Sequence, residues 1–251
     1  MRIDDRDAQN NFTLLRLVLA LLVLLGHFKA FVAVWSPPWP FNYAAAAVDC
    51  FFVVSGYLVS KSFDRDSNFS RFYLRRFFRI YPLYIAVVLA QTVILGCLAP
   101  GGFVANLRSE FDYLMVNAVF ANFIQHDIGE GVLRGLTDPS LNASLWTLKI
   151  EFAFYLILPF LWLGVQRYGW KLLVGVFMAS ALYYALVLHY VDFRHAKQLP
   201  GQLQFFVLGI AAYRYRDRLS LSPQIGFVLM VVLGVALTLL LHSRPPVLYP
   251  L

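Results

Sequence analysis

The sequence predicts an all-α fold, a polytopic membrane helix bundle with about seven transmembrane helices. Three observations lead to this prediction. Hydrophobic residues make up 60% of the chain and charged residues only 14%, against about 25% charged residues in an ordinary soluble domain. Apolar segments long enough to cross a bilayer recur along the chain. Basic residues gather in alternate connections between these segments, as membrane topology requires.

The apolar segments that we expect to cross the membrane are about residues 12–34, 44–60, 78–98, 144–165, 170–190, 202–213 and 223–242. The segment 12–34 is too long for a signal-peptide core and lacks a cleavage pattern of small residues, so we expect a retained first helix. The segment 202–213 is short of the roughly 20 residues that a span needs. The stretch 111–124 is apolar but interrupted by polar residues, which favours an interfacial or re-entrant segment.

The distribution of Lys and Arg predicts the orientation of the chain. Residues 61–79 carry a dense group of basic side chains, Lys61, Arg65, Arg71, Arg75, Arg76 and Arg79. The connection 99–143 instead holds more acidic than basic residues. By the positive-inside rule the first of these connections is cytoplasmic and the second is outside. The amino terminus is then cytoplasmic as well.

Two ionisable residues lie inside the first apolar segment, Arg16 and His27. Such groups are costly in a bilayer, by roughly 2.5–3.5 kcal/mol for Arg on insertion scales, and usually face a bundle interior where they have a function. His27 lies about 22 Å along a helix that enters from the cytoplasm near residue 12, in the outer half of the apolar layer. Asp49 begins the second helix from the outside and therefore lies at a similar depth. A carboxylate beside the imidazole would fix its tautomer and raise its basicity, as a general base requires.

The fourth long segment predicts a polar helix face. Ser144, Thr147, Glu151 and Tyr155 are spaced by three, four and four residues, so they line one side of a helix. A glutamate buried there is a functional candidate by default.

Four motifs resemble those of the acyltransferase-3 family. They are Arg16 followed after ten residues by His27, residues 48–58 (VDCFFVVSGYL), residues 71–82 (RFYLRRFFRIYP) and residues 144–155 (SLWTLKIEFAFY). Members of that family are integral membrane O-acyltransferases that take an acyl group, often acetyl, from acyl-CoA and place it on extracytoplasmic glycans or other acceptors. They commonly have about ten membrane helices, so the resemblance implies a shortened or partial member. Residues 1–251 are then expected to form a single acyltransferase-like membrane domain.

The resemblance also implies residue roles. His27 is the expected catalytic residue, and Glu151 is expected on the acceptor side or in the active-site framework. Asp49, which lies at a depth similar to that of His27, is expected to act with them in catalysis. Arg16 and the arginines at 75, 76 and 79 are expected to serve the donor. Planar guanidinium groups suit the phosphates of coenzyme A, and Arg75 and Arg79 share a face if that segment is helical. The acceptor side or active-site framework is expected to include Ser144, Trp146, Thr147 and Tyr155.

Several of these residues also have structural interpretations. The arginines at 71–79 suit any cytoplasmic connection. Asp49 suits a helix amino-terminal cap, and Trp146 and Tyr155 suit anchors at the membrane interface. His27 also suits a buried structural hydrogen bond. For Gly56 we favour close helix packing over a role beside a catalytic Ser55.

The expected partners are the lipid bilayer, acyl-CoA as donor substrate and a glycan or glycolipid acceptor. We expect no bound cofactor, no metal and no nucleic acid, because the chain has only two cysteines, Cys50 and Cys97, and no glycine-rich nucleotide loop. The resemblance implies a bacterial plasma membrane. The alternatives are a transporter or flippase with a polar path through Arg16, His27, Asp49 and Glu151, or a non-catalytic membrane relative. Matching broken helices in two repeats, the usual signature of a transporter, are absent from the sequence.

Overall fold

The structure is a computed structural model of the whole chain. It describes residues 5–31, 44–121, 124–125, 127–128, 131–133 and 145–218, and within the first helix it describes the side chains of residues 12–25. All the secondary-structure elements in these ranges are α-helices, so the predicted all-α fold is confirmed for the described part of the chain. The predicted segment 223–242 lies outside the described residues.

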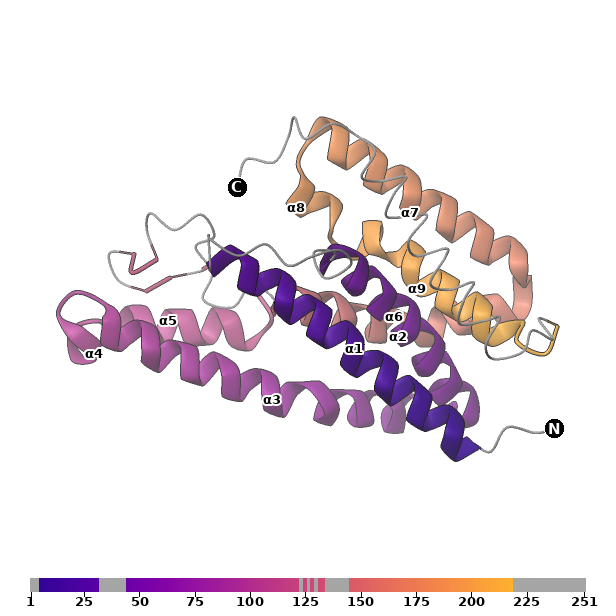
Figure 1. Cartoon of the computed structure of the whole chain (residues 1–251), viewed down its shortest axis with the longest axis horizontal. Coiled ribbons are helices and arrows are strands. Elements are labelled where there is room, and N and C mark those ends of the chain that lie inside the picture. Colours follow the sequence, from indigo (N-terminus) through magenta and orange to yellow (C-terminus); the bar gives the residue numbers. More distant parts are fainter. Residues whose placement is uncertain are drawn as a thin grey trace. The chain divides into compact units, whose positions relative to one another are not determined.

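The helices are α1 (Asp5–Phe31), α2 (Ala44–Arg65), α3 (Phe69–Leu98), α4 (Gly102–Ala105), α5 (Leu107–Ala118), α6 (Leu145–Tyr168), α7 (Trp170–Tyr190), α8 (Phe193–Ala196) and α9 (Leu199–Arg214) (Figure 1). Among them, α2, α3, α6 and α7 are long and apolar enough to cross a membrane. The apolar part of α1, Phe12–Leu25, is shorter, and α9 has 16 residues.

Contacts divide the chain into two compact units. Unit 1 contains residues Met1–Ser67 and Ile157–Val247, and unit 2 contains Asn68–Leu156 and Leu248–Leu251. The helix α6 contributes its first half to unit 2 and its second half to unit 1. Each unit is described separately below.

Unit 1 is built around the pair α2 and α9, which run side by side in the same direction (Figure 1). The ring centroids of Phe52 and Phe206 lie 4.7 Å apart near the start of the pair, and those of Tyr57 and Tyr213 lie 5.5 Å apart further along. At the far end the Tyr213 hydroxyl donates a hydrogen bond to Asp64 at 2.8 Å. The helix α7 packs on α9, and α1 packs on α2.

Two glycines set the distance between α2 and α9. A Cβ placed on Gly56 would lie 2.2 Å from the backbone oxygen of Phe206, and one on Gly209 would lie 2.0 Å from the backbone oxygen of Val53. No side-chain rotation relieves such a clash, because both obstacles are backbone atoms. Small residues that allow close backbone approach are typical of membrane helix pairs. The packing role predicted for Gly56 is therefore confirmed.

We expect Gly209→Ala to destabilise the protein by about 1–3 kcal/mol, because the added methyl forces α2 and α9 apart. The matched control is Gly175→Ala on α7, where a Cβ would meet nothing within 4 Å. There the helix propensity of alanine should stabilise by up to about 1 kcal/mol. Thermal unfolding in detergent should therefore move in opposite directions for the two variants. Equal shifts would mean that α2 and α9 are not packed this closely.

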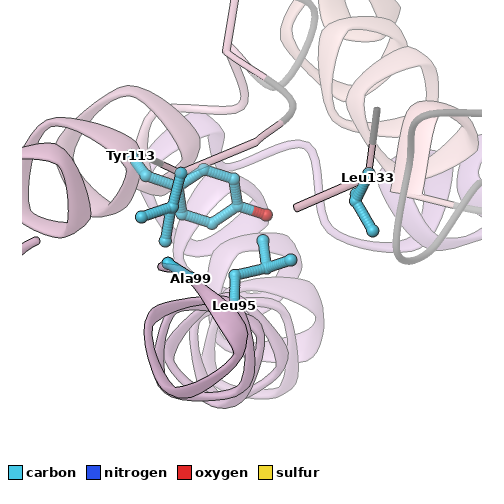
Figure 2. Packing of buried hydrophobic residues seen from close by; sticks show 5 residues of the cluster. Leu95, Ala99, Tyr113 and Leu133 are labelled. Atoms are coloured by element: carbon cyan, nitrogen blue, oxygen red, sulfur yellow. The ribbon is translucent and has the colours of Figure 1, made fainter. Parts of the chain in front are cut away.

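Unit 2 contains a helical hairpin in which α5 returns along the second half of α3 (Figure 1). The Tyr84 hydroxyl donates to the backbone oxygen of Asn117 at 2.6 Å, which ties the end of α5 to the middle of α3. Leu95 of α3 and Ala99, the residue that caps its end, pack on Tyr113 of α5 (Figure 2). Leu133 and Ile128 complete this cluster. The helix α5 has 12 residues, too few to span a bilayer.

A carboxyl group is buried inside this hairpin. Glu110 is only 3% exposed, and neither of its carboxyl oxygens has a hydrogen-bond partner among the described residues. It fills the space left by Gly96 of α3, where a Cβ would lie 2.1 Å from Oε1 of Glu110. Burial raises the pKa of the Glu110 carboxyl, because the charged form is desolvated there.

Because the pKa of Glu110 is raised in the folded protein, the free energy of unfolding should depend on pH. A carboxyl whose pKa is higher in the folded than in the unfolded state stabilises the fold below its unfolded pKa and loses that contribution as pH rises. We therefore expect Glu110→Gln to raise the thermal midpoint more at pH 8 than at pH 5. The control is Asp112→Asn, which changes an exposed carboxylate on the same helix. An equal effect of Glu110→Gln at both pH values would contradict this prediction.

The structure corrects several predicted boundaries. The segment 61–79 is not a connection, because α2 extends to Arg65 and α3 begins at Phe69, so only residues 66–68 join them. The arginines from 71 to 79 are therefore part of the first three turns of α3. The first helix begins at Asp5 rather than at residue 12. Within the stretch 111–124, residues 111–118 belong to α5, and the described residues 119–121 and 124 follow this helix without forming another.

Candidate active site

The arginines of α3 have different surroundings. The helix begins with a side-chain cap, in which Asn68 accepts a hydrogen bond from the backbone N–H of Arg71 at 2.9 Å. Arg75 and Arg79 are exposed, as expected for residues one turn apart on the same face. Arg76 points about 100° away from Arg75 around the helix and is only 7% exposed. Burial therefore separates Arg76 from the other arginines of its motif.

Within unit 2, Arg76 meets the polar face of α6. Its guanidinium carbon lies 5.6 Å from the ring centroid of Phe72 and 5.5 Å from that of Tyr155, within the range of cation–π contacts. The Tyr155 hydroxyl donates a hydrogen bond to Oε1 of Glu151 at 2.5 Å. We refer to Phe72, Arg76, Glu151 and Tyr155 as the Arg76 cluster.

The geometry of the Arg76 cluster confirms part of the polar face predicted on α6. Glu151 and Tyr155 are four residues apart in one continuous helix, and their side chains are hydrogen-bonded. Thr147 is half-buried one turn before Glu151, and Trp146 is half-buried beside it. Ser144, predicted on the same face, lies outside the described residues.

The Arg76 cluster is suited to binding a negatively charged group. A buried guanidinium is a permanent cation with planar donors, and here Nε of Arg76 is buried without a hydrogen-bond partner among the residues that the structure describes. Such a group can stabilise a phosphate or a developing oxyanion, and it does so more strongly in a dry environment than in water. The Glu151 carboxylate, oriented by Tyr155, provides a proton acceptor or a counter-charge nearby.

The other predicted site residues belong to unit 1. Arg16 of α1 and Asp49 of α2 are both half-buried. Leu19 of α1 forms one buried cluster with Ala47 and Val54 of α2. His27 lies on α1, about one turn beyond Val23, and its side chain is outside the described set. The structure thus brings Arg76, Glu151 and Tyr155 together, while Arg16, Asp49 and the backbone of His27 are placed in the other unit.

One member of the Arg76 cluster is absent from the sequence predictions. Phe72 is fully buried beneath Arg76. The available signal was spacing, because an aromatic residue four positions before an arginine on a helix places a ring under the guanidinium. Among the described residues there is no group of three or more His, Cys, Asp or Glu side chains that could hold a metal ion.

Comparison with known proteins gives several matches. A family model described as "Acyltransferase domain" matches residues 9–245. "Nodulation protein 10" of Rhizobium leguminosarum bv. viciae is 30% identical over 233 residues, which cover 84% of this chain and 61% of that protein. An "O-acetyl transferase" of Shigella phage Sf6 is 32% identical over 151 residues, 59% of this chain and 44% of the relative.

A third relative is the "Peptidoglycan O-acetyltransferase OatA" of Listeria monocytogenes, which is 30% identical over 152 residues, 56% of this chain and 24% of the relative. The chain therefore spans from about a quarter to about three fifths of the length of these relatives. No solved structure matches the chain significantly.

Proposed function

Because this chain belongs to the acyltransferase-3 family, whose model is the acyltransferase domain matched above, we propose that it is a membrane O-acyltransferase. In this proposal it moves an acyl group, with acetyl as the first candidate, from cytoplasmic acyl-CoA to a hydroxyl of a cell-surface or lipid-linked glycan. The names of two relatives support the reaction, since both are O-acetyltransferases, and the name of one supports a glycan acceptor. The activity of the whole protein is part of the proposal, because the chain covers only part of each relative's length.

The Arg76 cluster is the observation that carries the proposal. A permanent cation buried among the spanning helices is costly, so it is expected to have a function there. In this cluster the Arg76 guanidinium lies over the ring of Tyr155, and the Tyr155 hydroxyl donates a hydrogen bond to Glu151. Tyr155 and Glu151 belong to another motif of the same family resemblance. In acyl transfer, a positive group can stabilise the negative charge on the reacting carbonyl oxygen or hold the phosphates of the donor.

The proposed reaction proceeds in two steps. His27 accepts the proton of the glycan hydroxyl, and the oxygen attacks the thioester carbonyl of acyl-CoA. The C–S bond then breaks, and the departing thiolate of coenzyme A takes the proton from His27. Asp49 fixes the tautomer of His27. Arg16, Arg75, Arg76 and Arg79 hold the donor.

The acceptor side is formed by Glu151 with Trp146, Thr147, Tyr155 and Ser144. The protein acts in a bacterial plasma membrane with its amino terminus in the cytoplasm, so the donor enters from the side on which α3 begins. The pantetheine arm then reaches into the bundle to meet the acceptor.

The experiment that tests this function measures transfer of labelled acetyl from acetyl-CoA to surface glycan in membranes that carry the chain. Membranes without the chain are the control, and flux of unacylated glycan is measured in parallel. We expect label in the glycan only where the chain is present. Flux of glycan without label would identify a transporter and overturn the proposal, as would the absence of label and flux for every acyl-CoA and glycan acceptor supplied.

A further inference from the structure

A phenylalanine just after α5 has a backbone conformation that is unusual for its residue type. Phe120 lies two residues beyond the end of α5 and has a φ of 62°, in the left-handed region. Among the described residues other than glycine, it is the one with a positive φ. A bulky side chain in this region carries a conformational cost and persists only where the surrounding contacts compensate for it. The contacts of Phe120 are therefore expected to have a purpose.

The ring of Phe120 connects two helices of unit 2. Its centroid lies 4.2 Å from that of Tyr84 on α3 and 4.7 Å from that of Phe152 on α6. The interplanar angles are 24° and 15°, so both pairs are stacked. Phe120 is only 8% exposed. We refer to the stacked rings of Tyr84, Phe120 and Phe152 as the Phe120 bridge.

Hydrogen bonds hold the backbone of Phe120 in this position. Its N–H donates to the backbone oxygen of Asn117 at 3.0 Å, and the Tyr84 hydroxyl donates to the same oxygen at 2.6 Å. The side-chain nitrogen of Asn117 donates to the backbone oxygens of Tyr113 at 2.9 Å and Gln125 at 3.2 Å. Tyr84 therefore both fixes the turn after α5 and stacks on the ring that this turn presents.

The Phe120 bridge is one of two contacts between α3 and α6 that flank the Arg76 cluster. In the other, the Tyr73 hydroxyl donates to the backbone oxygen of Leu156 at 3.0 Å. Arg76 lies on α3 between Tyr73 and Tyr84, and Tyr155 lies on α6 between the two residues that these contacts reach. Because both contacts join the same pair of helices, together they fix how α6 lies against Arg76.

We propose that Phe120 is a positioning residue whose ring, by joining α3 to α6, holds Glu151 and Tyr155 in register with Arg76. This proposal rests on the proposed function, in which the Arg76 cluster acts on the reacting groups. Phe152 directly follows Glu151 in α6, so the bridge fixes the helix next to the glutamate. A displacement of about 1 Å in a reacting constellation can cost about 10²-fold in rate. Phe120 then acts through the two helices and touches neither substrate.

The first test asks whether the ring or only the turn matters, and it is independent of activity. Glycine adopts a positive φ freely, so a residue that served only the turn would tolerate Phe120→Gly with an unchanged or higher thermal midpoint in detergent. The bridge predicts a midpoint lower by at least about 4 °C. Phe111→Ala is the control, because it removes a 60% exposed ring from α5, and it should shift the midpoint by less than about 2 °C. An unchanged or higher midpoint for Phe120→Gly would overturn the proposal.

A double-variant cycle tests the contact of Phe120 with α6. Thermal midpoints are measured for Phe120→Leu, Phe152→Leu and the double variant, since leucine keeps an apolar side chain but not the stacked ring. The double variant should lower the midpoint by less than the sum of the two single losses, because each single variant already removes the stacking. Additive losses would mean that the two rings do not support each other, and the bridge would be wrong.

The kinetic test uses the acetyl-transfer assay. Phe120→Leu should lower kcat by about 10-fold or more with an unchanged KM for acetyl-CoA. Phe120→Tyr keeps the ring and should retain most of the native kcat, and Phe111→Ala should leave both constants unchanged. In the Arg76→Met background, Phe120→Leu should lower kcat by less than about 3-fold, because residues that act as a unit have non-additive effects. The same loss in both backgrounds would show that Phe120 does not act through Arg76.

These tests distinguish a failure of the positioning role from a failure of the proposed function. Acetyl transfer by the native chain with an unchanged kcat for Phe120→Leu would overturn the positioning role and leave the proposed function standing. A native chain that transfers no acetyl would overturn the proposed function and the positioning role together. The thermal cycle would then still decide whether Phe120 joins α3 to α6.

Discussion

His27→Ala is expected to lower the acyl-transfer rate by at least about 10²-fold. A sugar hydroxyl is a poor nucleophile at neutral pH, and a positioned base that removes its proton contributes roughly 10²–10⁴-fold. Alanine removes the imidazole without adding volume, so the helix should still form. The measurement is the initial rate of acetyl incorporation into glycan, with the amounts of native and variant chain in the membrane matched by immunodetection.

His189→Ala is the matched control for this substitution. His189 is exposed near the end of α7, where its ring lies against Tyr190 with centroids 4.6 Å apart. Its removal should leave the rate unchanged. A His27→Ala variant that retains the native rate would exclude His27 as the general base and would require another acceptor for the hydroxyl proton.

Arg76→Met is expected to have the second-largest effect, a loss of kcat of about 10- to 10²-fold, because the Arg76 cluster loses its buried cation. Removing a preorganised positive donor from a dry site costs up to about 10²–10³-fold in kcat. Arg79, by contrast, is exposed. Arg79→Met should therefore act mainly on the donor and raise the KM for acetyl-CoA. The measurement is the full dependence of the initial rate on acetyl-CoA concentration for both variants.

Two further variants sharpen the Arg76 test. Arg76→Lys keeps the charge but loses the planar group that lies over the rings of Phe72 and Tyr155, so it should recover only part of the activity. Arg71→Lys changes an exposed arginine of the same helix and should behave as the native chain. A large rise in KM with an unchanged kcat for Arg76→Met would mean that Arg76 only holds the donor, as the exposed arginines do, and does not stabilise the reacting carbonyl oxygen.

Hydropathy located the described helices well but not their ends. The segments 44–60 and 78–98 lie inside α2 and α3, yet these helices extend further, and the basic residues predicted in a connection are helical. The physical reason is that hydropathy marks the part of a helix that suits lipid, whereas arginine is a good helix former whose long side chain can reach water from within the helix. Asn68, which caps α3, gives the better marker of its start.

Spacing predicted part of the candidate site, since contacts within one helix depend only on the helical repeat. The hydrogen bond between Tyr155 and Glu151 is of this kind. The contact of Arg76 with Tyr155 is not, because it joins residues from two helices far apart in the sequence. The sequence analysis assigned the arginines at 75, 76 and 79 the same role toward the donor, and only packing against α6 shows that Arg76 is buried.

Three properties of this protein follow from the sequence alone: its helical membrane class, the approximate position of most of its helices and the motifs of its family. They follow because composition and periodicity are local and a bilayer demands long apolar helices. The tertiary structure decided which residues of different helices meet: Gly56 and Gly209 between α2 and α9, Glu110 against Gly96, and Arg76 against Tyr155. Such contacts depend on how helices pack and in which register, and one chain's hydrophobic pattern does not specify either.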